Sequence, residues 1–234
     1  CRRAANRAEF VVRVERDTGL RLEIISAQEE AELAVAGCGP LMDPMRSHAI
    51  LFDIGGGSTE VAWVETRQGL RVIDMISLPI GVVDLAERHA RSELTRLSYE
   101  SIASEVAESL AAFEARNAIL TQVADGAVQM IGTSGTVTTL AGIHMGLPRY
   151  DRSKVDGVHL AFDEAWRVAD RLLSMTRAER TAHPCVLEGR ADFVLPGTAI
   201  LAGICKMWPV GRLRVADRGL REGILLRMMK VAAA

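Results

Sequence analysis

The chain has 234 residues, of which 49% are hydrophobic and 25% are charged, and its formal net charge is −2. This length suits one large domain or one and a half small ones, and the composition is ordinary for a globular protein. The small net charge provides no basic field for nucleic acid, and no run of about 18 apolar residues is present to span a membrane. We therefore expect neither nucleic acid nor a membrane among its partners.

The four cysteines, Cys1, Cys38, Cys185 and Cys205, are scattered, with no CxxC pair and no histidine at metal-binding spacing. They are typical of core thiols in a reducing compartment, and no signal peptide is recognisable. The sequence thus predicts a cytoplasmic protein. Because the chain begins at a cysteine rather than Met, within a helical pattern, we expect a fragment whose beginning is missing.

The first part of the chain predicts a helix over residues 2–17 and an alternating strand over residues 20–25. A second helix follows over residues 27–36, with Ser26 as its N-cap and Glu29 completing a capping box. Further strands are expected over residues 48–53, 58–65, 71–77, 127–131 and 212–215, the first three as a meander. Further helices are expected over residues 82–89, 98–120, 163–175, 190–208 (interrupted at Pro196) and from residue 217 onward. Residues 150–158 and 177–189 are expected to be loops.

Two acids, Glu29 and Glu30, lie in the first turn of the helix predicted over residues 27–36. The helix dipole stabilises carboxylates at this position, and spacing alone favours that explanation for both acids. The functional alternative is that Glu30 points into a cleft and orients a water molecule.

The most informative stretch is residues 51–64, where a short apolar strand ends at Asp53 and three glycines lead into a second strand that carries Glu60. The glycines permit a tight turn, and successive N–H groups in such a turn form a concave anion site. An acid on each side is unusual for an anion site unless a divalent cation lies between protein and ligand, and magnesium prefers carboxylate and phosphate oxygens. The stretch therefore indicates a metal–phosphate site. The alternative is a tight hairpin whose glycines serve only the turn.

A second glycine element covers residues 132–142, where the strand predicted over residues 127–131 runs into a turn of small residues and then a helix. Free N–H groups at a helix start, two glycines and several hydroxyls suit a phosphate group. The alternative, favoured if this element is considered alone, is a Ser/Thr-rich N-cap with glycines needed for packing. The Gly-Lys-Ser/Thr of a Walker P-loop is absent, and so is GxGxxG.

Three motifs occur in order along the chain: DIGGGSTE at residues 53–60, GTSGT at residues 132–136 and DRGLREG at residues 217–223. Together they resemble the exopolyphosphatase / guanosine pentaphosphate phosphohydrolase (Ppx/GppA) family. Residues 23–26 and 29–31 also match that family, as do residues 2–6, so the resemblance covers nearly the whole chain. One departure is Ala27, where the family commonly has Gly.

The resemblance implies the actin-like ATPase (ribonuclease H-like) α/β fold, in which two related domains, each a mixed sheet with flanking helices, enclose a cleft. On this basis residues 1–39 are the tail of an incomplete first domain, whose opening strands and phosphate loop would precede residue 1. Residues 40–234 are the second domain. With half a cleft missing, we expect weak or no activity from this chain alone.

The resemblance also implies roles for three acids. Glu30 resembles the carboxylate that orients or deprotonates the attacking water, which overturns the dipole explanation for it. Glu60 resembles a second acid of the catalytic site. Asp53 resembles the acid that holds the divalent metal, and Glu60 is expected to share that metal site.

Phosphate binding is implied at both glycine elements and at the start of the chain. The residues concerned are Gly55, Gly56, Gly57 and Ser58 in the first element, Gly132, Ser134 and Gly135 in the second, and Arg2. The backbone N–H groups of the first element would cradle phosphate, and the second element would approach the other side of the phosphate chain. Arg190 is a further candidate.

These assignments predict a hydrolase that uses Mg²⁺ and water to remove terminal phosphate from inorganic polyphosphate, guanosine pentaphosphate or both. Such catalysis is mostly positioning and electrostatics. Two alternatives remain: a phosphotransferase of the same fold, and a non-catalytic sensor that binds polyphosphate or guanosine alarmones. The presence of both Glu30 and Glu60 argues against the sensor. A homodimer is compatible with the sequence, which does not define the oligomeric state.

Overall fold

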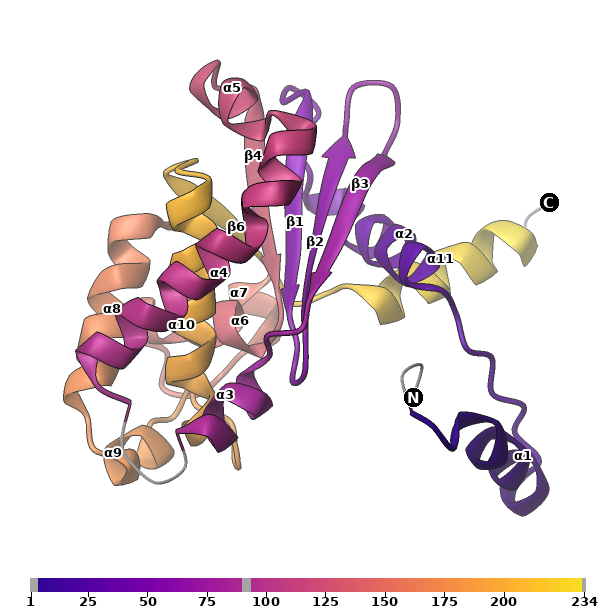
Figure 1. Ribbon diagram of the computed structural model, residues 1–234, viewed down its shortest axis with the longest axis horizontal. Helices are drawn as coiled ribbons and strands as arrows, with labels where there is room; N and C mark the ends of the chain where they lie inside the picture. Colours follow the sequence, from indigo (N-terminus) through magenta and orange to yellow (C-terminus); the bar gives the residue numbers. More distant parts are fainter. Residues whose placement is uncertain (1–3, 90–93, 233–234) are drawn as a thin grey trace.

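A six-stranded mixed sheet forms the centre of the computed structural model, which describes residues 4–89 and 94–232 (Figure 1). The strands are β1 (His48–Ile54), β2 (Thr59–Glu65), β3 (Arg71–Leu78), β4 (Val128–Thr133), β5 (His159–Ala161) and β6 (Arg212–Ala216). Their order in the sheet is β3-β2-β1-β4-β6-β5.

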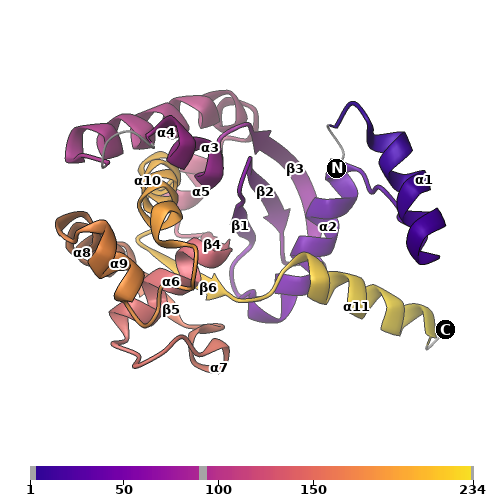
Figure 2. The ribbon, with the colours of Figure 1, turned by 90° about the horizontal axis from the view of Figure 1, so that it is seen from below.

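Helices cover both faces of the sheet. They are α1 (Arg7–Thr18), α2 (Ala27–Cys38), α3 (Val82–Arg88), α4 (Arg96–Asn117), α5 (Ile119–Ala124), α6 (Gly135–His144), α7 (Arg152–Val155), α8 (Phe162–Ser174), α9 (Arg177–Ala182), α10 (Ala191–Met207) and α11 (Leu220–Ala232), with a 3-10 turn η1 (Gly39–Leu41). Helices α3, α4, α6, α8 and α10 lie on one side of the sheet and α2 and α11 on the other (Figure 2). Helix α1 has no buried residue and projects away from the sheet.

Alternate residues of β1 face the two helical layers. Ile50 and Phe52 belong to the large core that also contains residues of α4, α6 and α10. Ala49 and Leu51 belong to a smaller core on the α2 side. Because both faces of β1 are buried, its sequence is a continuous apolar run rather than an alternating one.

Strand polarity brings the two glycine elements together. Strands β1, β2 and β3 form an antiparallel meander, whereas β1, β4 and β6 run parallel. Asp53 at the end of β1 is in register with Thr133 at the end of β4. Since the glycine elements follow directly after these two strands, they meet at the same edge of the sheet although they are far apart in sequence.

The predicted meander, β4, β6 and the main helices are confirmed. Gly19 (φ 73°) ends α1 in the left-handed conformation, and Ser26 caps α2 by accepting a hydrogen bond from the Glu29 N–H at 3.0 Å. The predicted capping box is wrong in its second half. The Glu29 carboxylate instead pairs with Arg227 of α11 at 2.7 Å.

The strand predicted over residues 20–25 is wrong. The segment is irregular, and Leu20 is 65% exposed. A strand needs hydrogen-bond partners on a neighbouring strand, and the sheet of the described residues offers none to this segment. The alternating pattern is present in the sequence, but the described residues contain no sheet edge with which this segment pairs.

Several boundaries also differ from the prediction. The helix predicted over residues 98–120 begins at Arg96 and breaks at Ala118 (φ 48°), which separates α4 from α5. The expected loops contain the short helices α7 and α9, and the three-residue strand β5 is too short for periodicity to detect. Pro196 lies inside α10 without ending it. Among the described residues no helix combines the length and apolar character needed to cross a bilayer.

Helices α2 and α11 lie side by side (Figure 1) because glycines let their backbones touch. A Cβ atom on Gly37 would lie 2.0 Å from the carbonyl oxygen of Gly219, and one on Gly223 would lie 1.9 Å from the carbonyl oxygen of Leu33. Real Cβ atoms never approach so closely. Gly223 of the DRGLREG motif therefore serves helix packing, as does Gly37 of α2, and this contact helps to fix the position of α2 and of the acids in its first turn.

We expect Gly223→Ala to lower stability by about 3 kcal/mol, because the added methyl group forces α2 and α11 apart in a packed region. For a chain of this size that loss lowers Tm by about 6–12 °C, which thermal unfolding followed by circular dichroism would measure. Arg221→Ala on the exposed face of α11 is the matched control and should change Tm little. Equal Tm values for the two variants would contradict the packing role.

Candidate functional site

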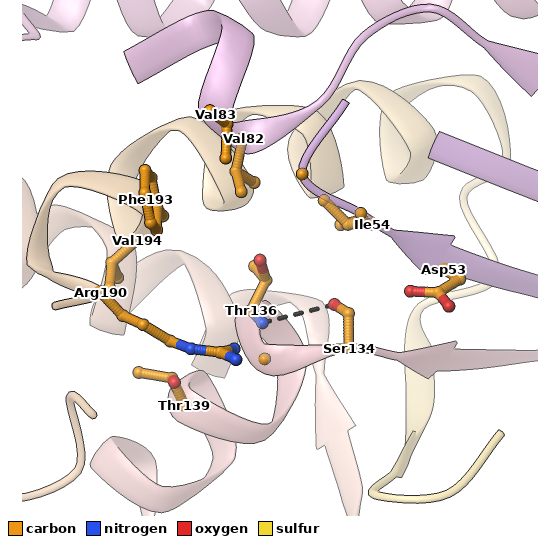
Figure 3. A pocket seen from close by; sticks show the side chains of 13 residues that line it. Asp53, Ile54, Val82, Val83, Ser134, Thr136, Thr139, Arg190, Phe193 and Val194 are labelled. Atoms are coloured by element: carbon orange, nitrogen blue, oxygen red, sulfur yellow. Dashed lines mark hydrogen bonds between the residues drawn. The ribbon is translucent and has the colours of Figure 1, made fainter. Parts of the chain in front are cut away.

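A pocket of about 380 Å³ opens where β1 and β4 end. Asp53, Ser134, Thr136, Thr139 and Arg190 form a polar side of it, and Ile54, Val82, Val83, Phe193 and Val194 form an apolar side (Figure 3). The pocket is therefore shared by both glycine elements, the start of α3 and the start of α10.

The first glycine turn is held rigidly by backbone hydrogen bonds. The Gly55 N–H donates to the Ser58 carbonyl at 2.9 Å, and the N–H groups of Val82 and Val83 donate to the carbonyls of Gly55 and Gly56 at 3.0 and 2.8 Å. The start of α3 thus closes over the turn. Since its N–H group already has an acceptor, Gly55 contributes no free donor to the predicted phosphate cradle.

The other backbone N–H groups of this turn are free to donate hydrogen bonds. Within the described chain the N–H groups of Gly56, Gly57 and Ser58 have no hydrogen-bond acceptor. Gly56 lines the pocket, whereas Gly57 and Ser58 lie beyond its lining. The cradle predicted for this turn is therefore reduced to Gly56 at the pocket itself, with two further free amides beside it.

The second glycine element places a helix N-terminus at the pocket. Ser134 has φ 111°, an uncommon and strained conformation for a residue other than glycine, and its Oγ accepts a hydrogen bond from the Thr136 N–H at 3.3 Å. Helix α6 begins at the next residue, Gly135, and both residues line the pocket. The positive end of the helix dipole and a free N–H at Gly135 favour an anion here.

Gly132 is not part of the pocket lining, so its predicted contact with phosphate stays a prediction. It lies inside β4, where a Cβ atom would stand 2.5 Å from Cζ of Phe52. The missing side chain therefore makes room for a core ring, and the packing alternative considered for this element holds at this one position.

Arg190 reaches the N-terminus of α6 from the start of α10 (Figure 3). Its Nη1 atom lies 2.2 Å from where a Cβ atom on Gly135 would stand, so a side chain at position 135 would make the guanidinium move from its place against the helix. A guanidinium beside free helix N–H groups is well suited to a phosphate group.

Three carboxylates influence one another at this edge of the sheet. Burial, the largest cause, and the charges of Glu60 and Glu30 together raise the pKa of Asp53 from 3.8 to about 6. The fold thus places negative groups from β1, β2 and α2 close enough to interact. This concentration of negative charge is unfavourable without a counter-ion.

Two hydroxyl groups hold Glu60 in place. Its Oε1 accepts hydrogen bonds from Ser58 Oγ at 2.6 Å and from Ser77 Oγ at 2.9 Å. Ser77 lies opposite Glu60 in the β2–β3 ladder. The sequence prediction missed Ser77, although the meander register would have placed it beside Glu60.

The two acids of α2 have different surroundings. Glu29 is paired with Arg227 on α11, whereas Glu30 contributes to the field at Asp53. The structure thus gives the two acids different neighbours, and the role of Glu30 stays a prediction. Arg2, the remaining predicted phosphate ligand, lies outside the described residues.

A metal ion at this edge would have few protein ligands. The described residues contain no group of three or more His, Cys, Asp or Glu side chains arranged to hold a metal. Mg²⁺ usually binds through one or two carboxylates and keeps waters or substrate phosphates as its other ligands. The partly buried Asp53, with Glu60 nearby, therefore fits Mg²⁺ that arrives with a phosphate ligand.

The DRGLREG motif anchors the strand-to-helix connection behind this site. The Thr133 hydroxyl donates to the Arg218 carbonyl at 2.8 Å, and the Gly219 N–H donates to the Glu222 carboxylate at 2.9 Å. Glu222 also pairs with Arg152 at 2.6 Å. These contacts connect β4, α7 and α11, so this motif supports the site without lining its pocket.

Fold and site together define an α/β protein of the actin-like ATPase fold, with a pocket that a helix N-terminus, an arginine and a carboxylate line. The chain belongs to the Ppx/GppA phosphatase family, whose sequence profile matches residues 1–232. It is 27% identical over 214 residues to exopolyphosphatase 2 of Mycobacterium tuberculosis, a match that covers 90% of this chain and 65% of that protein. The chain thus spans about 65% of the length of the curated relatives it matches.

Solved structures agree with the family assignment. A crystal structure of an Aquifex aeolicus member of the Ppx/GppA family superposes with a TM-score of 0.83 at 28% identity, covering 100% of this chain and 72% of that one. An exopolyphosphatase from Cytophaga hutchinsonii has the same fold, with a TM-score of 0.82 at 24% identity over 98% of this chain and 72% of that one. The predicted family and fold are confirmed.

We expect Asp53→Asn to stabilise the protein at neutral pH in the absence of metal. The pKa of Asp53 is about 6 in the folded chain and 3.8 ordinarily, so the native state loses stability as pH rises from about 4 through 6. The variant should therefore exceed the wild type by about 1–3 kcal/mol at pH 7, with a smaller gap at pH 4. Urea unfolding at both pH values, with EDTA present, measures this gap.

The matched control is Asp163→Asn, which removes an exposed carboxylate of α8. It should give the same small stability difference at both pH values. A gap for Asp53→Asn that does not change between pH 4 and pH 7 would contradict the electrostatic origin of the effect.

Proposed function

We propose that this chain carries out, or supplies the second-domain part of, hydrolysis of a terminal phosphoanhydride bond in inorganic polyphosphate, guanosine pentaphosphate or both. The observation that carries the proposal is the meeting of three carboxylates with the N-terminus of α6 at one edge of the sheet. The name of the Mycobacterium tuberculosis relative, an exopolyphosphatase, supports polyphosphate as the substrate class.

The phosphate chain is bound by groups of the pocket. The free N–H groups at Gly135 and Gly56 donate to phosphate oxygens, and the Arg190 guanidinium neutralises part of their charge. Beyond Arg190 lies the apolar side of the pocket, with Val82, Val83 and Phe193. A polyphosphate chain has no apolar group to place on this surface, whereas a guanine base has one. Guanosine pentaphosphate therefore stays within the proposal.

Glu30 positions the attacking water. An ionised carboxylate accepts a hydrogen bond from water and takes its proton as the new O–P bond forms, while the bridging P–O bond of the phosphoanhydride breaks and the shortened chain leaves as a phosphate anion. Glu30 lies on α2, whose contact with α11 is rigid, and its charge is felt at Asp53. Glu60 accepts hydrogen bonds from Ser58 and Ser77, which hold its carboxylate in a fixed geometry. It supplies a second negative charge near Asp53.

Asp53 and Glu60 would hold the divalent cation. When bound, Mg²⁺ neutralises charge on the phosphate oxygens and stabilises the negative charge that builds up during transfer. Its binding would also offset the unfavourable burial of the Asp53 carboxylate, which raises the pKa of that group to about 6.

We propose a cytoplasmic location on the basis of the thiols. Cys38, Cys185 and Cys205 are buried and free in the described part of the chain. Burial raises the pKa of Cys38 to about 12, which keeps it protonated and unreactive. Such thiols are typical of a reducing compartment.

Phosphate release from defined substrates tests the function. The purified full-length protein is incubated with Mg²⁺ and either long-chain polyphosphate or guanosine pentaphosphate in water enriched in oxygen-18. Released phosphate that carries the heavy isotope supports hydrolysis and names the substrate. Transfer only in the presence of an added alcohol acceptor would instead indicate a phosphotransferase, and binding without any release would indicate a sensor.

We expect Glu30→Gln to reduce phosphate release at least about 100-fold, because the amide cannot accept the proton of the attacking water. Substrate affinity, measured by titration calorimetry, should be nearly unchanged. Glu29→Gln is the matched control, since it removes the adjacent acid that pairs with Arg227, and it should retain activity. Equal loss of activity in both variants would contradict the role of Glu30 in positioning water.

We expect Mg²⁺ to raise the Tm of the wild-type protein by a few degrees but to leave Asp53→Asn unchanged, because ligand binding to the native state alone stabilises it. Differential scanning fluorimetry with and without about 10 mM Mg²⁺ measures the shift in Tm. This concentration is well above the Kd of a weak carboxylate site. An equal shift in both proteins would show that Asp53 does not hold the ion.

A further inference from the structure

A second cavity lies at the opposite end of the sheet from the catalytic pocket. It has a volume of about 280 Å³ and is found where β4 and β6 begin. Its polar lining consists of Asp43, Arg46, Gln129, His159, Arg212 and Arg214. Because β4 and β6 run parallel to β1, the length of the strands separates this cavity from Asp53 by about 20 Å.

Three arginines give this far-end cavity a positive charge. In the described part of the chain, Arg46, Arg212 and Arg214 form no ion pair with any carboxylate, unlike most arginines of the surface. Asp43, the one carboxylate of the lining, also has no ion pair there, and its Oδ1 accepts the Met45 N–H at 2.9 Å. Three guanidinium groups therefore face the cavity with a single carboxylate to offset them.

Two of these arginines are fixed by the backbone. Arg214 donates from Nη1 to the Leu41 carbonyl at 2.8 Å and from Nε to the Gly157 carbonyl at 3.0 Å. Arg46 donates from Nη1 to the Gly126 carbonyl. Neutral carbonyl partners orient the guanidinium groups without cancelling their charge. The side chain of Arg212 has no hydrogen-bond partner within the described residues, so its guanidinium donors are free for a ligand.

Hydrogen bonds also hold the wall of the cavity in a fixed shape. The Asp43 N–H donates to Gln129 Oε1 at 2.8 Å, and Gln129 Nε2 donates to the Asp43 carbonyl at 2.9 Å. This reciprocal pair ties the segment before β1 to β4. The cavity therefore keeps its shape between a strand and a fixed loop.

The pKa of His159, which lines the cavity, shows the sign of the local electrostatic field. Burial lowers the pKa of His159, and the charges of Arg214 and Arg212 lower it further, against the opposite effect of Asp43. Positive charge therefore outweighs negative charge at the mouth of the cavity.

We propose that the far-end cavity binds a small phosphate anion, either free inorganic phosphate or the end of a short phosphate chain. Guanidinium groups match the geometry of phosphate oxygens, and three of them can neutralise a multivalent anion. The volume of about 280 Å³ lies at the small end of ligand pockets, which suits one or two phosphoryl groups rather than a nucleotide. This proposal does not depend on the proposed hydrolysis.

The test is a titration of the isotopically labelled protein, followed by backbone amide NMR, with inorganic phosphate and separately with pyrophosphate. Saturable shifts at Gly126, Gln129 and Val210 are expected, because these residues line the cavity. Shifts at Gly56 and Gly135 report the catalytic pocket independently. Similar affinity for both anions identifies a single-phosphate site, and tighter binding of pyrophosphate identifies a site for a chain end.

Arg212→Gln should weaken binding at the far-end cavity by roughly tenfold, the loss expected for a hydrogen bond to a charged group, and leave the Gly56 and Gly135 titration unchanged. Arg167→Gln, at an exposed arginine of α8, is the matched control. Arg212 is chosen because it is exposed and has no backbone partner whose loss would disturb folding. Absence of saturable shifts at the cavity, shifts that chloride of equal ionic strength reproduces, or equal affinity in both variants would overturn the proposal.

Discussion

The close contact between α2 and α11 helps to hold the first turn of α2 beside the sheet. At Gly37 and Gly223 the two helices approach so closely that no Cβ atom would fit. Because Leu20 to Ile25 before α2 is irregular, the position of α2 depends on this contact together with its packing against the sheet. The charge of Glu30, in that first turn, influences Asp53 from there. The geometry proposed for catalysis thus depends in part on two glycines outside the pocket.

The site combines groups whose supports come from different parts of the fold. Asp53 ends a buried parallel strand, Glu60 is held across the meander by Ser77, and Gly135 starts a helix against Arg190. Each support is a packed or hydrogen-bonded contact. Water or a phosphate ligand would therefore meet a preorganised arrangement, which is how electrostatic catalysis gains its effect.

Much of this architecture could be predicted from sequence. The meander, the two glycine elements and their meeting with the helix that carries Glu29 and Glu30 follow from periodicity, turn residues and family motifs, whereas the pairing of Glu29 with Arg227 does not. Other features could not be predicted, because they depend on contacts between distant segments. Gly132 packs against Phe52, Gly55 uses its amide within its own turn, and Ser77 reaches Glu60 through strand register. Short-range patterns show where a glycine is needed but not whether a ligand or a neighbouring side chain requires it.

The backbone of Ser134 has a cost in stability. A non-glycine residue at φ 111° costs on the order of 1–3 kcal/mol, and Ser134 lies directly before helix α6 at the pocket. Glycine adopts this conformation without that cost, but it would remove the hydroxyl oxygen that accepts the Thr136 N–H. Ser134 therefore exchanges global stability for a fixed first turn of α6 at the edge of the pocket.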